Sequence, residues 1–132
     1  DFPDLLRRYR SEYQFTFAQL HRFANFHTPT LHEAYTAPNL LRKFLEAYLG
    51  FRKPSVSKWS DKLDMLFATG EEQLEIQRFA NDSSHLQGIG RALQQPDFIP
   101  NAQRCVLMVL QGLRARDFEH YQSLCVIIGA TP

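Results

Sequence analysis

Residues 37–51, APNLLRKFLEAYLGF, predict a helix with an unusually wide apolar surface. At about 100° per residue, its apolar side chains sweep most of the circumference. They are Leu40, Leu41, Phe44, Leu45, Tyr48, Leu49 and Phe51. Such a helix is buried on more than one side, so other helices must cover it. Pro38 suits the opening of this helix, which we expect over about 39–51 with Pro54 beyond its end.

Helical spacing continues through the rest of the chain. We expect further helices at about 3–25, 59–67, 69–81, 100–114 and 118–128. Thr69 and Glu72 form a capping box, and Asp117 is expected to cap the last helix. Residues 81–90 interrupt the pattern, with a short helix after them left open. The prediction is an all-α helical bundle of five to seven helices, in a single domain over 1–132.

The bulk composition narrows the classes of function. The chain has 132 residues, 44% of them hydrophobic, and a formal net charge of +1. These values exclude a disordered tail, and they require any nucleic-acid surface to be a local patch. No apolar run reaches the roughly 18 residues of a membrane span, so we expect a cytoplasmic protein without a membrane partner. Cys105 and Cys125 lie in apolar runs and are expected to be buried, reduced thiols.

Several familiar motifs are missing from the 132 residues. The sequence has no G-x-x-x-x-G-K-[ST], so this chain alone holds no nucleotide through a P-loop. It has no H-E-x-x-H and no G-x-S-x-G. His21, His27 and His32 are spaced so that they do not line one helix face, and we expect no metal site. The chain begins with Asp, and we expect it to be a fragment of a larger protein.

Arg42 and Glu46 raise the question of function, because they lie one turn apart at the edge of the apolar arc. One interpretation is a surface ion pair worth about 0.3–0.5 kcal/mol. The other is half of an active site, since a pair held against apolar side chains keeps the fixed geometry that catalysis needs. His85 follows in RFANDSSH (78–85), where a helix C-terminus favours a positive charge. The alternative for His85 is an exposed loop residue without function.

Three blocks, LLRRYRSEYQFTF (5–17), APNLLRKFLEAYLGFRKP (37–54) and EIQRFANDSSH (75–85), give the chain a family resemblance. In this order they resemble the C-terminal part of RloC- and PrrC-type ATPases, which are ABC-like NTPases fused to an anticodon-nuclease region. The resemblance implies that Arg42, Glu46 and His85 are catalytic and that their side chains converge on one cleft. The residues expected to bind RNA are Lys43, Arg52, Lys53, Lys58, Arg78 and Asn81.

The resemblance implies an HEPN-like fold for the all-α bundle. It also implies a metal-independent endoribonuclease of an anti-phage defence ATPase, with tRNA as its substrate. Arg42 would grip phosphate oxygens, and Glu46 and His85 would share the proton transfers, in an order left open. The products would be a 2′,3′-cyclic phosphate and a 5′-hydroxyl. No cofactor is expected in this chain, because ATP or GTP belongs to an NTPase region of the same or a partner chain.

Other interpretations of the sequence stay open. The chain is alternatively a non-catalytic helical module that docks or assembles an AAA/ABC-type ATPase, or an unrelated helical binding domain. Assembly into a homo-oligomer is left open as well. The basic residues Arg7, Arg8 and Arg10, like those around Arg52, are alternatively a solvated face. Phe51 and Trp59 are candidates to stack on an unpaired base.

Overall fold

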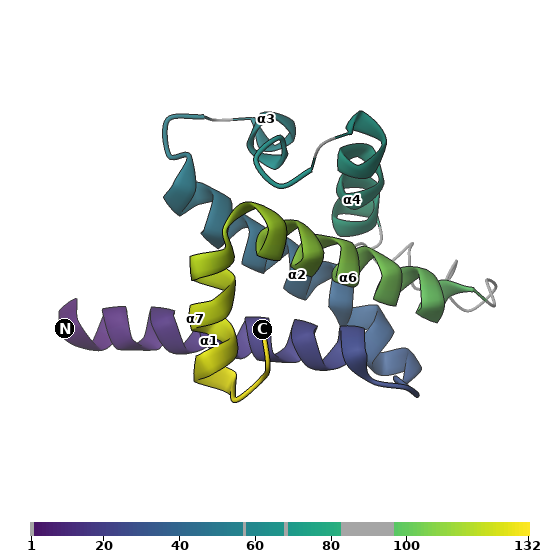
Figure 1. Cartoon of the computed structure of the whole chain (residues 1–132), viewed down its shortest axis with the longest axis horizontal. Helices are drawn as coiled ribbons and strands as arrows, with labels where there is room; N and C mark the ends of the chain where they lie inside the picture. Colours follow the sequence, from purple (N-terminus) through teal and green to yellow (C-terminus); the bar gives the residue numbers. More distant parts are fainter. Residues whose placement is uncertain (1, 57, 68, 83–96) are drawn as a thin grey trace.

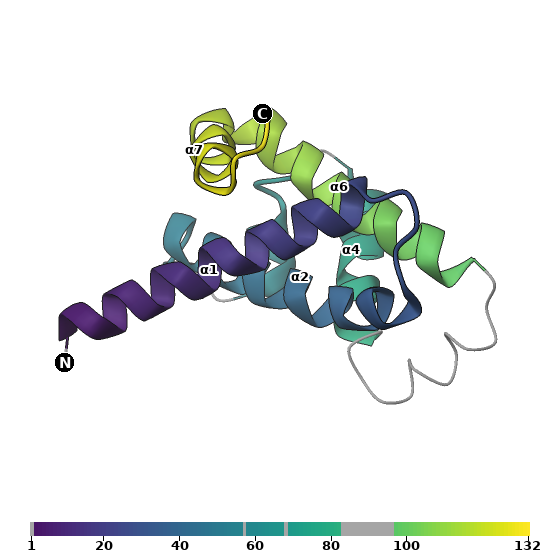
Figure 2. The same cartoon turned by 90° about the horizontal axis from the view of Figure 1, so that it is seen from below.

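Six α-helices make up the described part of this computed structural model, shown from two directions in Figures 1 and 2. The description covers residues 2–56, 58–67, 69–82 and 97–132, without the side chains of 2–11, 59, 60 and 82. The helices are α1 (Phe2–Asn25), α2 (Leu31–Arg52), α3 (Trp59–Leu63), α4 (Gly70–Asp82), α6 (Phe98–Arg116) and α7 (Phe118–Ile128). These residues contain no strand, and the predicted all-α bundle is confirmed.

The helices pack around a centre formed by α1, α2 and α6, each of which contacts the other two. Helix α7 turns back at the end of α6 and lies against α1. Helix α4 packs against α2 and α6, and α3 lies beside α4. Both views show the N-terminal part of α1 extending beyond the other helices. The bounds of α1, Phe2–Asn25, agree closely with the first helix predicted at about 3–25.

Helix α2 begins eight residues earlier than expected, and Pro38 lies inside it rather than at its start. Thr30 is the N-cap: its hydroxyl accepts from the Glu33 N–H at 3.1 Å, and Glu33 Oε1 accepts from the Thr30 N–H at 3.1 Å. This capping box starts the helix before the proline is reached. Ala34, Ala37 and Pro38 are all buried, so tertiary packing holds the segment helical despite the missing proline N–H.

The segment before α4 is less regular than predicted. Helix α3 ends at Leu63, and hydrogen bonds of the tighter i→i+3 kind follow it, from Met65 N to Lys62 O and from Leu66 N to Leu63 O. The change of direction brings Leu66 and Phe67 into the core, at 2% and 3% exposure. Helix α4 runs to Asp82 as expected, and Glu72 N donates to the Thr69 hydroxyl at 3.2 Å.

Helices α6 and α7 meet at Asp117, where the predicted side-chain cap of α7 is not formed. Helix α6 covers Phe98–Arg116, slightly longer than expected, with Pro100 in its first turn. Asp117 precedes α7, but its side chain makes no capping hydrogen bond to that helix. Its carboxylate instead accepts a hydrogen bond from the Tyr48 hydroxyl near the end of α2. Helix α7 ends in a Schellman motif: Gly129 adopts φ 75°, and Ala130 N donates to Cys125 O at 2.8 Å.

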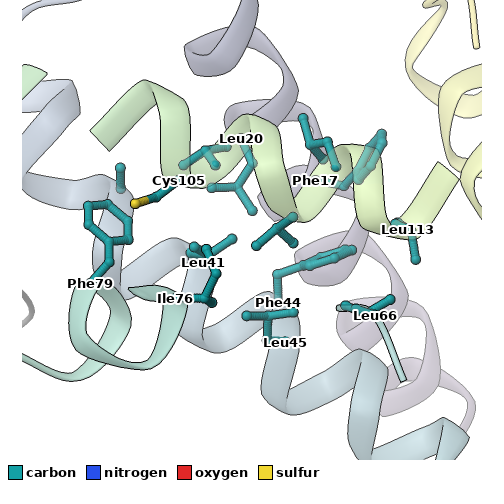
Figure 3. Packing of buried hydrophobic residues seen from close by; sticks show 14 of the residues in the cluster. Phe17, Leu20, Leu41, Phe44, Leu45, Leu66, Ile76, Phe79, Cys105 and Leu113 are labelled. Carbon is teal, nitrogen blue, oxygen red and sulfur yellow. The ribbon is translucent and has the colours of Figure 1, made fainter. Parts of the chain in front are cut away.

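Buried side chains from all six described helices, including Leu63 of the short α3, come together in one continuous core, part of which is drawn in Figure 3. Phe17 and Leu20 come from α1, Leu41, Phe44 and Leu45 from α2, and Ile76 and Phe79 from α4. Cys105 and Leu113 of α6 complete the group that Figure 3 labels, together with Leu66. The core is what fixes the backbone of α2, from which the candidate site projects.

Two sequence expectations about the core have clear outcomes. Cys105 and Cys125 are buried and free, as predicted, and burial raises the pKa of the Cys105 thiol. Phe51 does not join the buried arc of α2: it is 71% exposed, because it lies in the last turn, beyond most of the helices that cover α2. Within the described ranges, no helix combines the length and apolar character needed to cross a membrane.

Candidate functional site

Arg42 and Glu46 form an ion pair on the outer side of α2. Arg42 Nε donates to Glu46 Oε1 at 3.0 Å. Their side chains are 42% and 53% exposed, so both charges are open to solvent and to a ligand. The neighbouring Leu41 and Leu45 are fully buried, which fixes the backbone that carries the pair. The geometry is that of a surface i,i+4 pair, with a cation and a carboxylate side by side at an accessible position.

His85, the third predicted catalytic residue, lies outside the described residues, and so does its predicted convergence with Arg42 and Glu46. The helix that leads toward it is well placed by contacts. Helix α4 buries Ile76 and Phe79 in the core next to α2, and Figure 3 shows Ile76 beside Leu41. Glu75 of α4 also forms an ion pair with Arg104 of α6. Helix α4 is thus fixed against α2 up to three residues before His85.

The predicted RNA-binding residues come from three helices and their ends. Lys43 is exposed on α2, and Lys53 and Lys58 lie at the end of α2 and the start of α3. Lys43 and Arg52 are nine residues apart, so they face opposite sides of α2. Arg52 Nε also lies 3.4 Å from Asp117 Oδ2. Arg78 is exposed on α4 and Asn81 is half-buried there. Their RNA-binding role stays a prediction, as do roles for Arg7, Arg8, Arg10 and Trp59, whose side chains are outside the description.

A groove lies between α1 and α2, and Glu46 is part of its wall. Its volume is about 540 Å³. Aromatic rings of Tyr13, Phe15 and Phe44 line it together with Lys43. Tyr13 and Phe44 stack with ring centroids 5.0 Å apart, which gives the groove a rigid aromatic wall. The groove therefore adjoins the Arg42–Glu46 pair through a shared residue.

Phe15 is the groove residue that sequence reasoning missed. It is 62% exposed, and it lies on the side of α1 opposite the fully buried Phe17. The apolar periodicity of α1 passes through Tyr13, Phe17 and Leu20, so Phe15 falls outside it. A large aromatic residue outside the apolar stripe of an amphipathic helix is a sign of a binding surface, and Phe15 could have been identified in this way.

A second polar cluster joins α1, α2 and the α6–α7 corner. The Tyr13 hydroxyl and His120 Nε2 share a hydrogen bond of 2.7 Å. The Tyr48 hydroxyl donates to Asp117 Oδ2 at 2.7 Å, and Arg52 approaches the same oxygen. The His120 ring lies 5.1 Å from that of Tyr48. Sequence reasoning missed this cluster because its members are separated by up to 107 positions in the chain.

Burial dominates the electrostatics of this cluster. It lowers the pKa of His120, an effect that Asp117 opposes and Arg52 reinforces. It also raises the pKa of Tyr48, and the hydrogen bond to Asp117 raises that pKa further. His120 is therefore held neutral, and Tyr48 keeps its proton, at neutral pH. The cluster therefore joins three helices through hydrogen bonds, with the neutral His120 and Tyr48 beside the Arg52–Asp117 ion pair.

Metal-ligating side chains do not gather in the part of the chain that the structure describes: no three His, Cys, Asp or Glu groups lie together there. The Arg42–Glu46 pair offers two functional groups. A guanidinium can bind two oxygens of a phosphate, and a carboxylate can accept a proton. A further proton-transfer group would complete an acid–base site.

Comparison with protein families shows where this chain belongs. The profile of a protein family described as an AAA domain matches residues 1–108. The matched residues include α1, α2 with the Arg42–Glu46 pair, and α4. Neither the curated proteins nor the solved structures contain a match to this chain.

Proposed function

This chain belongs to the AAA domain family, and on that premise we propose that it is a metal-independent endoribonuclease domain associated with an AAA-type ATPase. Its proposed substrate is tRNA, cut in the anticodon loop as part of prokaryotic anti-phage defence. The resemblance of three sequence blocks to RloC- and PrrC-type ATPases supports this substrate and this role. The observation that carries the proposal is the exposed Arg42–Glu46 pair on a rigidly packed helix.

The proposed reaction needs three groups. A base takes the proton from a ribose 2′-hydroxyl, whose oxygen then attacks the adjacent phosphorus. A cation stabilises the additional charge on the five-coordinate phosphate, and Arg42 suits that role through its forked donors. An acid gives a proton to the departing 5′-oxygen. Glu46 and His85 share the two proton transfers, and the products are a 2′,3′-cyclic phosphate and a 5′-hydroxyl. DNA is spared because it lacks the attacking hydroxyl.

The position of the pair supports catalysis in two ways. Glu46 lies on the wall of the groove between α1 and α2, so a ligand in the groove meets its carboxylate. Arg42 holds Glu46 at 3.0 Å, so the carboxylate and the cation stay oriented together. Replacing either residue of the pair should destabilise the fold little, because an exposed i,i+4 pair contributes only about 0.3–0.5 kcal/mol to stability. Function and stability are therefore separable by mutation.

The test is cleavage of purified tRNA by the chain and by Arg42→Ala, Glu46→Gln and His85→Ala. We expect each variant to lose activity by about 10²–10⁴-fold, the usual effect of removing an acid–base or charge-stabilising group. Arg116→Ala, which changes an exposed arginine on α6, is the matched control and should cleave normally. Mass spectrometry should find the cyclic phosphate and the 5′-hydroxyl. Intact tRNA with the wild-type chain, or variants as active as wild type, would overturn the proposal.

The second candidate is a non-catalytic docking module of the same ATPase. It is favoured by apolar side chains on the outer side of α7, where Val126 is 69% and Ile127 53% exposed. Patches of this kind mark interaction surfaces. If wild type leaves tRNA intact while Val126→Asp weakens its association with the nucleotide-binding region, docking replaces cleavage as the proposed function.

A further inference from the structure

We propose that the groove between α1 and α2 holds one unstacked base of single-stranded RNA, with Phe15 as the stacking surface. The inference rests on the proposed function, because it places the base beside Glu46 of the proposed catalytic pair. It adds a substrate-binding subsite in a part of the fold that the predicted catalytic and RNA-binding residues, apart from Lys43 and Glu46, do not include.

The size and lining of the groove suit a base. Its volume of about 540 Å³ lies within the range of small-ligand sites, which is about 300–1,000 Å³. The lining is mostly apolar and aromatic, and its polar residues are Glu12, Thr16, Lys43 and Glu46. The Thr16 hydroxyl donates to the backbone oxygen of Glu12 at 2.7 Å. That combination of a flat apolar surface and few polar groups is how proteins hold an unpaired base.

Phe15 provides the face on which a base would stack. Its side chain is 62% exposed at the groove, whereas Tyr13 and Phe44 are packed on each other as the wall behind it. Stacking of a base on an exposed aromatic side chain contributes about 1–3 kcal/mol. The ring needs no rearrangement of the core to accept a base, because it lies off the buried side of α1.

The charges in the groove favour a base and its ribose over a bare phosphate. Glu12 and Glu46 bring two carboxylates to the lining, and Lys43 brings one ammonium group. Carboxylates accept hydrogen bonds from the amino groups of bases and from ribose hydroxyls, and they repel phosphate. Arg42, the ion-pair partner of Glu46, supplies the cation for the phosphate next to the bound base. The base in the groove and the phosphate at Arg42 thus belong to adjacent parts of one RNA strand.

The experiment measures binding without cleavage. The probe is a fluorescent single-stranded oligonucleotide whose 2′-oxygens are all methylated, so that no cyclic phosphate can form. We expect Phe15→Ala and Phe15→Leu to weaken binding by about 5- to 150-fold, the equivalent of 1–3 kcal/mol, and Phe15→Trp to retain it. Phe118→Ala removes a ring of 45% exposure on α7 and should bind like wild type. Circular dichroism checks that each variant is folded.

Each outcome decides the inference. Unchanged binding in Phe15→Ala, wild-type binding in Phe15→Leu, or no binding by the wild-type chain would each overturn it. Loss of binding in both variants, with Phe15→Trp and Phe118→Ala unaffected, supports it. Phe15-dependent binding by a chain that leaves tRNA intact would uphold the subsite and remove the proposed nuclease. Cleavage that needs Arg42 but not Phe15 would uphold the proposed nuclease and overturn the subsite.

Discussion

Gly112 shows how a single missing side chain can permit a close contact between backbones. A Cβ atom placed at Gly112 would lie 2.9 Å from the carbonyl oxygen of Leu66, which is closer than real Cβ atoms approach. The glycine in α6 therefore lets the turn after α3 lie directly on the helix. Gly50, in α2, is different, because nothing lies within 4 Å of its Cβ position.

The two glycines form a matched pair for a stability test. Gly112→Ala should lower the free energy of unfolding by about 1–2 kcal/mol, because the backbone of Leu66 has to move away. Gly50→Ala should raise it by about 0.5–1 kcal/mol, the normal gain from replacing glycine inside a helix. Urea unfolding monitored by circular dichroism measures both. Stabilisation by Gly112→Ala would show that the turn is not held against α6.

At the residue scale, the sequence predicted local pairs and missed distant ones. The contact between Arg42 and Glu46 follows from helical spacing alone, and it is present. Asp117 was predicted to cap α7, because an Asp before a helix usually does. Its carboxylate instead accepts from Tyr48, 69 positions away. No local rule anticipates that partner, since it depends on how α2 and α7 pack.

At the scale of the element, α2 shows why a helix start is difficult to read. Pro38 looks like a first-turn residue, whereas the capping box of Thr30 and Glu33 is the true signal. The backbone and hydroxyl hydrogen bonds from Thr30 are also what lower the pKa of Glu33. Periodicity found the body of α2 and of α1, α4, α6 and α7, because their apolar residues face one core. It predicted too long a helix at α3. The helix ends at Leu63, and the chain then turns so that Leu66 and Phe67 are buried.

The capping box gives the prediction for this scale. Thr30→Ala should lower the free energy of unfolding by about 0.5–2 kcal/mol, since the N–H of Glu33 loses its acceptor. The first turns of α2, before Pro38, should also exchange their amide hydrogens faster. Thr28→Ala, at an exposed position before the cap, is the control and should change stability by less than about 0.5 kcal/mol. Equal stability of the two variants would contradict the capping role.

At the scale of the whole molecule, the fold class could be predicted and the complete site could not. Helical periodicity and the absence of strand patterns lead to an all-α bundle, which the structure has. Whether a His joins Arg42 and Glu46 depends on the path of the chain after α4, which spacing does not encode. The groove beside Glu46 arises only when α1 and α2 pack together, and the cluster around His120 also needs the α6–α7 corner.

The His120 cluster gives the molecule a pH-dependent stability. Burial lowers the pKa of His120 in the folded chain below 6.5, so the unfolded chain binds more protons as the pH falls past that value. The contribution of the neutral His120 to the free energy of unfolding is therefore fully present above about pH 7. It declines as the pH falls toward about 5, because the folded state favours the neutral ring. The groups that face the ring are Tyr13, Tyr48, Asp117 and Arg52.

The measurement is urea unfolding of wild type and His120→Gln at several pH values between 5 and 8. We expect the variant to be less stable at pH 8 and to show a smaller decline toward pH 5. His21 contributes a decline of the same sign, because burial also lowers its pKa, so His21→Gln should remove a separate part. His27→Gln, at an exposed position, serves as the control. A decline that His120→Gln leaves unchanged would show that the cluster is not the titrating group.

The position of Asp117 has a consequence for how the protein is made. The hydroxyl of Tyr48 belongs to a residue that is 2% exposed, and its acceptor lies 69 residues later in the chain. During synthesis Tyr48 is made before Asp117, so its hydroxyl has no native partner until the α6–α7 corner follows. A nascent chain that has not reached Asp117 therefore contains a polar group that favours leaving the cluster open to water. The Tyr48 hydroxyl thus gains its acceptor only when the α6–α7 corner packs against the end of α2.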